Sequence, residues 1–326
     1  AVYQGAWRGL PVAVKMVLFP AGSSMQERVV QEVATCLCLS HRNIVATYRY
    51  DIREVAVRQE EGQLLQVEEM QVQDTSAAPA DKERYSTGVE QPSAYKLYLV
   101  QELCAVSLAQ ASDQGMLHDP YEGAVYEALT LAIMLDIAEG LTYLHSKSII
   151  HGDLKPDNVL LQHDAKCMVG VVAKLADFGL SAAMGPEATH VSNYRAGTPF
   201  YIAPEIVVQH QLTKASDIYS FGVLMWEMYS NIKPFTLCPT SDKLVFNPEF
   251  WSFPSWVNQS VYKLVSWCMQ REPNARPTAD QVRRTLESLL IASCDPASSD
   301  VAAAAAPDAA AVSLTVGADV SGHPAA

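Results

Sequence analysis

Hydrophobic residues form short strand-like runs in the first hundred residues and long helical stripes after them. Residues 1–17 are β-rich and punctuated by glycines, which predicts two strands joined in a hairpin. Residues 24–39 carry apolar side chains at helical spacing after a serine suited to capping, which predicts a helix with one buried face. Residues 44–50 and 95–101 are again typical of strands. We therefore expect a small sheet with one helix in this part of the chain.

Beyond residue 103 the spacing of apolar positions becomes that of helices. The clearest stripe lies in residues 125–146 and consists of Leu129, Ile133, Ile137, Leu141 and Leu144. Further helices are expected at residues 217–229, 256–269 and 279–292, separated by turns that contain Pro and Asn. The sequence thus predicts an α+β chain in which a mainly helical lobe follows a sheet lobe.

Two stretches fall outside these patterns. Residues from about 52 to 94 are rich in Gln, Glu, Asp, Ser and Ala, and we interpret them as an acidic, partly disordered insertion. Residues 293–326 are rich in Ala and have no periodicity, which is typical of a disordered tail. The expected organisation is an N-terminal lobe at residues 1–102, a C-terminal lobe at residues 103–292, and this tail.

Composition and charge narrow the class of protein. Of the 326 residues, 49% are hydrophobic and 18% charged, which is an ordinary globular balance. The formal net charge of -13 argues against whole-protein attraction to nucleic acid or to anionic lipid. There is no uninterrupted apolar run of about 20 residues, so we expect no membrane segment in this chain. The odd count of 7 cysteines suits a reducing compartment, and we expect a cytoplasmic location; upstream targeting stays open, because the chain lacks an initiator methionine.

Two loops carry the candidate chemistry. The run HGDLKPDN at residues 151–158 follows the longest predicted helix and offers a carboxylate, an ammonium and a carboxamide in Asp153, Lys155 and Asn158. The run DFG follows an apolar strand-like run and adds Asp177, whose oxygens suit Mg²⁺. Phosphoryl transfer needs such a set, with a metal ion and a cation on the phosphates and a carboxylate beside the attacking hydroxyl.

These runs resemble the catalytic loop and the metal-binding triplet of the protein kinase signature set. The resemblance implies the two-lobed protein kinase fold, with a small antiparallel sheet lobe that carries one key helix and a larger, mainly helical lobe. It makes Asp153 the catalytic base, Lys155 the γ-phosphate contact, and Asn158 and Asp177 the Mg²⁺ ligands. The implied cofactors are ATP and Mg²⁺, and the implied partners are protein substrates with Ser or Thr hydroxyls.

The N-terminal lobe supplies most of the nucleotide contacts that the resemblance implies. The run VAVK at residues 12–15 resembles the strand whose lysine, here Lys15, grips the α- and β-phosphates. Glu32 stands at the position of the helix glutamate that pairs with this lysine. The implied contacts of the adenine and of the strand that links the lobes are Val2, Ala13, Leu160, Glu102 and Cys104.

The C-terminal half continues the resemblance, which covers nearly all of residues 1–292. The run GTPFYIAPE at residues 197–205 resembles the segment that receives the substrate and ends the activation loop. Asp217 resembles the buried aspartate that anchors the catalytic loop, and Arg276 would pair with Glu205. Lys155 and the Gly-Thr-Pro tripeptide at residues 197–199 resemble the pattern of serine/threonine kinases. Residues 2–9, 41–45 and 221–227 resemble the tyrosine-kinase-like group, relatives of the Raf and mixed-lineage kinases.

Three positions depart from the family pattern. Only Ala1 and Val2 match the end of the glycine-rich loop, so the glycines that cover the phosphates would lie upstream of this chain. Gly152 replaces the arginine that usually precedes the catalytic aspartate and meets a phosphate on the activation loop, so we expect an enzyme independent of that switch. Gln101 stands where the family has the residue that guards the back of the adenine pocket, and it should alter inhibitor preference.

Alternative functions are weighed against catalysis. A pseudokinase would use the same fold as a binding or scaffold module, and dual specificity stays open. A pure scaffold needs none of the catalytic set, which is present in full as Lys15, Glu32, Asp153, Asn158 and Asp177. A small-molecule kinase is disfavoured by residues 197–205, which resemble a platform for peptide substrates. His151 is expected to brace the core below the catalytic loop and not to act on substrate.

Overall fold

The computed structural model describes residues 1–20, 33–58, 66–69, 94–178, 181–183, 190–192, 194 and 196–294. The chain divides into two compact units, and each is described by itself. Unit 1 comprises residues 1–40 and 46–103. Unit 2 comprises residues 41–45 and the chain from residue 104 onward, so the short segment 41–45 belongs to unit 2 although unit 1 flanks it on both sides in the sequence.

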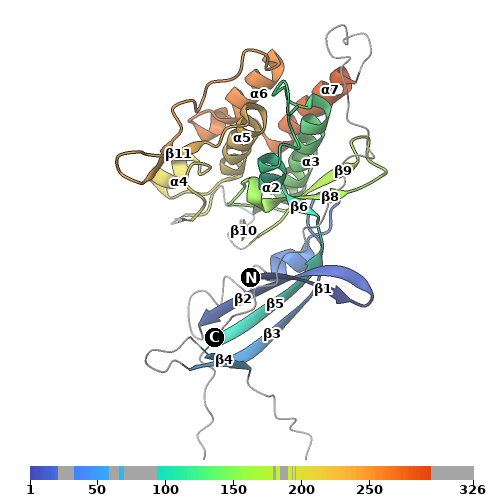
Figure 1. Ribbon diagram of the computed structural model, residues 1–326. Helices are drawn as coiled ribbons and strands as arrows, with labels where there is room; N and C mark the ends of the chain where they lie inside the picture. Colours follow the sequence, from blue (N-terminus) through green and yellow to red (C-terminus); the bar gives the residue numbers. More distant parts are fainter. Residues whose placement is uncertain are drawn as a thin grey trace, which may run out of the picture. The chain divides into compact units, whose positions relative to one another are not determined.

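Unit 1 is built on an antiparallel sheet of five strands in the order β1-β2-β5-β3-β4 (Figure 1). The strands are β1 (Val2–Trp7), β2 (Leu10–Pro20), β3 (Thr47–Arg58), β4 (Gln66–Glu69) and β5 (Ala94–Glu102). Arg8 and Gly9 join β1 to β2 with φ angles of 52° and 80°, which is the backbone of a tight hairpin turn. The predicted N-terminal hairpin is therefore present.

One face of this sheet carries the core of unit 1. Phe19, Leu97, Leu99 and Val33 form a buried cluster, and Val17 and Tyr95 pack against it. Val33 begins a described helical segment that runs to residue 38. The rest of the helix predicted at residues 24–39, up to and including Glu32, lies outside the described residues. Because side chains alternate along a strand, Val17 and Phe19 place their face of β2 toward this helix.

Strand β3 is longer than the sequence pattern predicts. We expected a strand at residues 44–50 and an insertion from about residue 52, but β3 continues to Arg58 and β4 follows at Gln66–Glu69. The extension pairs with β5, with Ile52 opposite Leu97 and Val55 opposite Ala94. The apolar positions of 52–58 complete the sheet, so the insertion begins later than predicted. Residues 59–65 and 70–93 lie outside the described residues.

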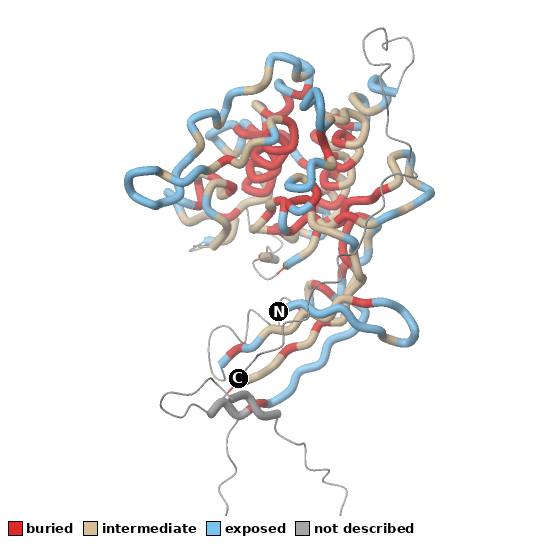
Figure 2. The backbone as a smooth tube through the Cα atoms, in the orientation of Figure 1, coloured by how far each residue is buried: buried red, intermediate tan, exposed pale blue. Residues whose placement is uncertain are grey.

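Unit 2 is mainly helical, and two helices run through its centre (Figures 1 and 2). Its helices are α2 (Leu108–Asp113), α3 (Glu127–Ser146), α4 (Pro204–Gln209), α5 (Lys214–Ser230), α6 (Gln259–Cys268) and α7 (Ala279–Ser293). Helix α5 is buried on all sides from Ser216 to Tyr229. An apolar helix with no solvated face is typical of a protein core. Helix α3 buries most of its predicted stripe, while Leu129 is half-buried.

Short sheets join the helices of unit 2. Strands β6 (Val106–Ser107), β8 (Val159–His163) and β9 (Val171–Leu175) form one sheet, and β7 (Ile149–Ile150) pairs with β10 (Ala182–Ala183). Strands β11 (Phe235–Leu237) and β12 (Leu244–Phe246) form a hairpin that the sequence pattern did not predict. Segment 41–45 lies along β9, where the Val45 N–H donates to the Leu175 carbonyl at 2.9 Å and the Leu175 N–H donates to the Asn43 carbonyl at 2.9 Å.

Helix α3 is the one helix in the described part of the chain that is long and apolar enough to cross a membrane by length and composition. Half of its apolar window is buried inside the protein. Ile137, Leu141 and Leu144 are fully buried, so α3 has the environment of a core helix.

Candidate active site

Asp153 and Lys155 lie close together in the loop between β7 and a short 3₁₀ turn, η1 (Pro156–Asn158). The Lys155 Nζ is 3.2 Å from Asp153 Oδ2, and both side chains are largely shielded from solvent. The hydroxyl of Thr198 bridges the pair, because it donates to Asp153 Oδ1 at 2.6 Å and accepts from Lys155 Nζ at 2.8 Å. The structure thus brings the predicted base and the predicted phosphate contact together with one residue of the predicted substrate segment.

Asn158 is oriented by the same carboxylate. Its Nδ2 donates to the Asp153 carbonyl at 2.8 Å and to Asp153 Oδ2 at 3.1 Å. Because both bonds use the amide nitrogen, the Oδ1 oxygen of Asn158 is directed away from Asp153. An amide oxygen in this position suits Mg²⁺, which takes oxygen ligands.

Asp177 follows strand β9 and lies beside the loop of Asn158. The Ala176 N–H donates to the Asn158 carbonyl at 2.9 Å, which ties the residue before Asp177 to the second predicted metal ligand. Asp177 has a left-handed backbone with φ of 60° and is exposed. A non-glycine residue in this region is uncommon, and such backbone occurs preferentially at functional sites.

The donor set fits Mg²⁺ better than a metal held by protein alone. Within the residues that the structure describes, no group of three or more His, Cys, Asp or Glu side chains could hold a metal ion. Mg²⁺ is commonly held by one or two protein oxygens together with the phosphates of its nucleotide and with water. Asn158 and Asp177 are a set of this kind.

Asp217 holds the backbone of the catalytic loop from below. Its carboxylate is 1% exposed and accepts from the His151 N–H at 2.9 Å and from the Gly152 N–H at 2.9 Å. The Nε2 of His145 lies 2.8 Å from the same carboxylate. Burial of a carboxylate is tolerated only when its oxygens are hydrogen-bonded, and here they orient the loop that ends in Asp153.

His151 braces this loop from the interior. It is fully buried, its Nε2 lies 3.0 Å from the Ala176 carbonyl, and its ring packs against Phe178. The Asp153 N–H donates to the His151 Nδ1 at 3.3 Å. The side chain therefore joins the catalytic loop to the segment that carries Asp177.

Gly152 has a left-handed backbone with φ of 79°. Glycine adopts this region without the steric cost that a Cβ brings. The local backbone thus gives a reason for glycine at this position.

Unit 1 gathers the predicted nucleotide contacts on one face of its sheet. Lys15 of β2 stands opposite Val2 of β1, and Ala13 stands opposite Gln101 of β5. Directly opposed residues of an antiparallel pair share a face, and positions two apart along a strand do too. Val2, Ala13, Lys15 and Gln101 therefore lie on one face, the face of β2 that also carries Val17.

Glu102 differs from these residues. It stands opposite Val12 on the other face of β2, and its carboxylate accepts from the Ala46 N–H at 3.3 Å. Its backbone N–H donates to the Ala46 carbonyl at 2.9 Å. Its side chain thus joins β5 to the segment before β3 and does not share the face of Lys15.

The two remaining predicted adenine contacts belong to unit 2. Leu160 is a half-buried residue of β8, opposite Ser107 of β6. Cys104 is half-buried and precedes Ala105, whose N–H donates to the Leu161 carbonyl at 2.9 Å. Both residues therefore lie at the β6–β8 pair.

Glu205 and Arg276 form the buried ion pair that the sequence predicted. Two parallel bonds join them, from Arg276 Nη1 to Glu205 Oε1 at 2.7 Å and from Nη2 to Oε2 at 2.8 Å, and the side chains of Arg276 and Glu205 are 0% and 2% exposed. Arg276 also donates to the carbonyls of Ala215, Gln270 and Arg271, and Ser216 donates to Glu205. A buried pair persists only when its remaining polar atoms are bonded in this way. It fixes the end of the substrate segment to α5 and to the turn after α6.

A protein kinase domain profile matches residues 1–286. The chain belongs to the protein kinase family. The match spans the catalytic loop, the DFG run and the substrate segment, so the predictions of a protein kinase and of its two-lobed α+β fold are confirmed.

Individual relatives are similar over part of their length. The LRR receptor-like serine/threonine-protein kinase ERECTA of Arabidopsis thaliana is 31% identical over 69% of this chain and 26% of its own length. The probable LRR receptor-like serine/threonine-protein kinase RKF3 of the same plant is 36% identical over 53% of the chain and 31% of its own length. The dual specificity protein kinase shkB of Dictyostelium discoideum is 31% identical over 49% and 25%. The chain thus spans a third or less of these relatives, and the Raf and mixed-lineage grouping stays a prediction.

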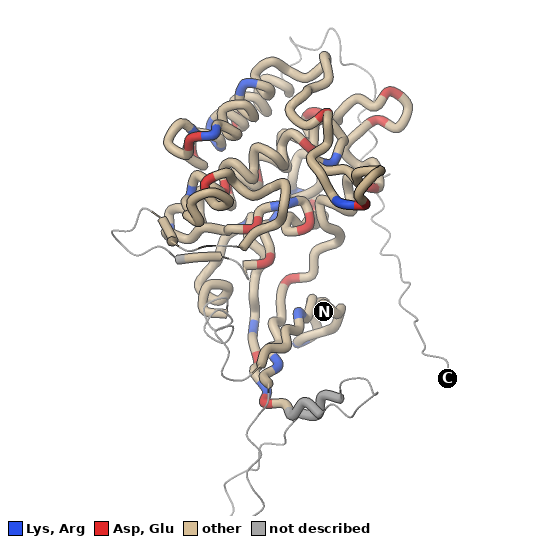
Figure 3. Tube along the Cα trace, turned by 90° about the vertical axis from the view of Figure 1, so that its left-hand side faces the viewer, with Lys and Arg blue, Asp and Glu red and all other residues tan. Residues whose placement is uncertain are grey.

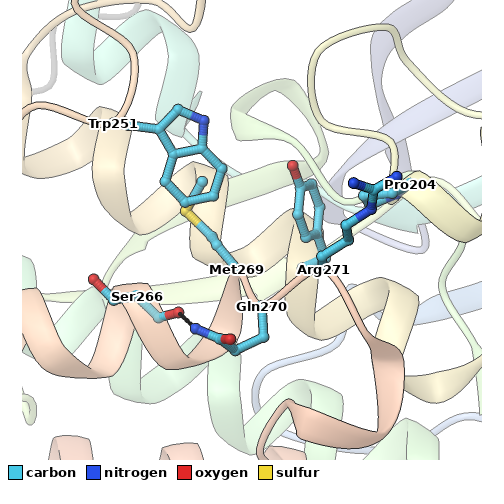
Figure 4. A pocket seen from close by; sticks show the side chains of 7 residues that line it. Pro204, Trp251, Ser266, Met269, Gln270 and Arg271 are labelled. Carbon is cyan, nitrogen blue, oxygen red and sulfur yellow. Dashed lines mark hydrogen bonds between the residues drawn. The ribbon is translucent and has the colours of Figure 1, made fainter.

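Behind the substrate segment of this kinase lies an open cavity of about 510 Å³ (Figure 4). Pro204 lines one side, Trp251 and Met269 another, and Arg271 lies near Pro204. The Gln270 Nε2 donates to the Ser266 carbonyl at 2.9 Å along its floor. None of its lining residues belongs to the catalytic loop.

Positions of Lys and Arg are interspersed with positions of Asp and Glu along the described backbone of each unit of the kinase, and neither sign forms one large block in the view of Figure 3.

Two residues of the kinase site were missed by sequence reasoning about roles. Thr198 was used only as part of the serine/threonine pattern and was given no role in the site. Its hydroxyl contacts both Asp153 and Lys155. Asp136 of α3 was not considered, yet its carboxylate accepts from the Ala173 N–H at 2.8 Å and holds β9, the strand before Asp177. Burial raises the pKa of Asp136 to about 6, against the opposing effect of that hydrogen bond.

Glu32 lies outside the described residues, and its pairing with Lys15 stays a prediction.

Proposed function

We propose that the whole protein transfers the γ-phosphate of ATP to serine or threonine hydroxyls of protein substrates. The observation that carries this proposal is the bonded set of Asp153, Lys155, Asn158 and Thr198, in which a shielded carboxylate has an ammonium at 3.2 Å. A scaffold would not require this arrangement, whereas phosphoryl transfer depends on positioning and on charge.

The residues of unit 2 have distinct parts in the reaction. An acceptor hydroxyl beside Asp153 gives its proton to the carboxylate as its oxygen attacks the γ-phosphorus. A new O–P bond forms, the bond from the γ-phosphorus to the bridging oxygen breaks, and ADP leaves with that electron pair. Lys155 balances the charge of the transferred group. Its Nζ lies 3.2 Å from Asp153 Oδ2. Thr198 bonds to the side chains of both Asp153 and Lys155 and so positions them relative to the substrate segment.

Asn158 and Asp177 are the residues that would hold Mg²⁺. A bound Mg²⁺ would supply positive charge that offsets the negative charge of the ATP phosphates. In unit 1, Lys15 would contact the α- and β-phosphates, and Val2 and Ala13 would pack on the adenine from the same sheet face. In unit 2 we propose Leu160 and Cys104 as adenine contacts. For Glu102 we propose backbone contact alone, because its side chain lies on the other sheet face.

The test is transfer of labelled phosphate from Mg²⁺-ATP to a generic protein substrate by the full-length protein. We expect label on serine and threonine, and its loss in the Asp153→Asn variant. Label on tyrosine as well would identify dual specificity. Binding of Mg²⁺-ATP without transfer to any substrate would support a pseudokinase instead and would overturn the proposal.

We also propose that this catalytic unit works in the cytoplasm. Seven cysteines form no disulfide within the described residues, which suits a reducing compartment. Imaging of the full-length protein with a fluorescent tag would test this, and a signal confined to an oxidising compartment would contradict it.

A further inference from the structure

The β11–β12 hairpin presents four apolar side chains on one face. Phe235 stands opposite Phe246, and Leu237 stands opposite Leu244. Because directly opposed residues share a face and positions two apart along a strand do so too, these four side chains form a single surface. We call it the hairpin face.

The hairpin face is largely open to solvent. Leu237, Leu244 and Phe246 are each more than half exposed, at 54%, 55% and 54%, and Phe235 is half-buried. Single exposed apolar residues are ordinary, but a contiguous apolar surface on a protein marks a site of interaction. The four residues are contiguous by their strand register.

One end of the hairpin face touches the substrate segment. The ring of Phe200 lies 5.3 Å from the ring of Phe235 and 4.9 Å from that of Phe246. Phe200 has a φ of 74°, a strained backbone for a bulky residue, so local packing holds its ring in this position. Only Pro199 separates it from Thr198, whose hydroxyl is 2.6 Å from Asp153 Oδ1. The hairpin face therefore contacts a residue that lies two positions along the chain from a side chain bonded to Asp153.

The Phe246 end of the hairpin is also fixed to the core of unit 2. The ring of Phe250 lies 5.3 Å from that of Phe246 and 5.0 Å from that of Trp226, a fully buried residue of α5. The Trp226 Nε1 donates to the Ser252 carbonyl at 2.7 Å. An isolated two-stranded hairpin is marginal, so these contacts are what hold the face in place. The surface is thus a supported one.

We propose that the hairpin face, together with Phe200, binds a large apolar side chain of the protein substrate close to the acceptor residue. This inference rests on the proposed function, since it names the substrate feature that the same site selects. Phe200 stands two residues after Thr198, a span of at most about 7 Å at 3.3 to 3.6 Å per residue, so a substrate side chain within about four positions of the acceptor comes within reach of Phe200 and Phe246. The occupant is a Phe, Leu, Ile or Met of the substrate, because polar side chains gain nothing from these rings and methyl groups.

The test uses the full-length protein with Mg²⁺-ATP and a set of peptides of equal length and charge, each with one serine. One peptide has Ala at every neighbouring position, and in the others a single Phe is moved through the four positions on either side of the serine. For the wild type we expect one Phe position to raise kcat/KM about tenfold over the Ala peptide, mainly through KM.

Two variants test the surface itself. Phe246→Ser removes a ring beside Phe200, and Leu244→Ser alters the open end of the face without touching Phe200. Both should bring the ratio of kcat/KM between the Phe and Ala peptides down toward one. Tyr121→Ser, which alters a 94% exposed aromatic residue elsewhere on unit 2, should leave the ratio at its wild-type value. Thermal unfolding of each variant shows whether it is folded, and Leu244→Ser keeps the test valid if Phe246→Ser unfolds.

The outcomes separate this inference from the proposed function. Phosphorylation of every peptide with no preference for Phe, or a preference that both hairpin variants retain, would overturn the inference and leave the kinase activity standing. If no peptide is phosphorylated, fluorescence anisotropy of the labelled peptides still decides the matter. Tighter binding of the Phe peptide that both hairpin variants abolish would support the hairpin face, and equal binding of the two peptides would refute it.

Discussion

The catalytic loop at residues 151–158 and the β11–β12 hairpin belong to the same unit but are built in opposite ways. In the catalytic loop nearly every polar side chain is held by bonds of 2.6–3.3 Å, and Asp217 fixes the backbone beneath it. In the hairpin, Leu237, Leu244 and Phe246 point to solvent, with ring packing at one end as their support.

This difference separates two tasks. Reaction chemistry tolerates little displacement of the reacting groups, so the loop is held by directional bonds to buried atoms. Recognition of an apolar side chain is less directional, so an exposed surface on a supported hairpin suffices. We therefore expect changes in the loop to abolish turnover or stability, and changes in the hairpin to alter which substrates are used.

The largest effect should come from Asp153→Asn. The amide cannot accept the proton of the acceptor hydroxyl, so kcat should fall between about 10²- and 10⁴-fold. Isothermal titration with Mg²⁺-ATP should show nearly unchanged nucleotide binding. Asp157→Asn is the matched control, because Asp157 is an exposed carboxylate in the same loop, and it should retain turnover. Equal losses in both variants would contradict the role of Asp153.

Asp217→Ala should come next, as a loss of stability. The change leaves His145 and the two N–H groups of His151 and Gly152 without their buried acceptor. We expect the free energy of unfolding to fall by about 3 to 5 kcal/mol, as for a broken buried pair. Urea denaturation measures this loss. The control is Lys243→Ala in the exposed turn of the hairpin, whose free energy of unfolding should stay within about 0.5 kcal/mol of the wild type.

The carboxyl of Asp136 should make stability depend on pH. Its folded pKa of about 6 lies above the ordinary value of 3.8, so the folded state binds this proton more tightly than the unfolded state. Its contribution to stability is present below about pH 4 and is lost as the pH rises through 6, by at most about 3 kcal/mol. Denaturation of Asp136→Asn between pH 4 and 7 should lack this decline. A decline of the same size in the variant would refute the assignment.

The smallest effect on stability should come from Leu244→Ser. More than half of this side chain is already exposed, so its replacement should change the free energy of unfolding by less than about 0.5 kcal/mol. Urea denaturation beside Asp217→Ala gives the contrast directly. A loss above about 2 kcal/mol would show that the hairpin face is part of the core and would remove the distinction between the two regions.

The sequence predicted the elements whose apolar pattern is long. The stripe at residues 125–146 became α3 (Glu127–Ser146), and the pattern at residues 279–292 became α7 (Ala279–Ser293). Long patterns repeat over several turns, so single exceptions such as the half-buried Leu129 do not obscure them. Recognition of the HGDLKPDN and DFG runs likewise predicted the acidic and amide groups that the fold brings together.

Short elements and distant partners could not be predicted in this way. Strands β11 and β12 have three residues each, too few for a periodic signal, and their pairing depends on packing against Phe200 and Phe250. Asp136 bonds to Ala173, 37 positions away, and nothing in the residues around Asp136 marks that partner. The role of Thr198 likewise depends on a contact with a loop 45 residues earlier in the chain.

Segment 41–45 has a consequence for any attempt to divide this kinase into autonomous fragments. Ile44 and Val45 are 1% and 3% exposed, and the Lys174 Nζ donates to the Arg42 carbonyl at 2.7 Å. A cut between residues 103 and 104 would therefore remove from unit 2 the peptide that lies along β9 and would open the apolar surface that it covers. Segment 41–45 of unit 2 lies between two parts of unit 1 in the sequence. Recombination at a single junction would therefore not transfer either unit complete.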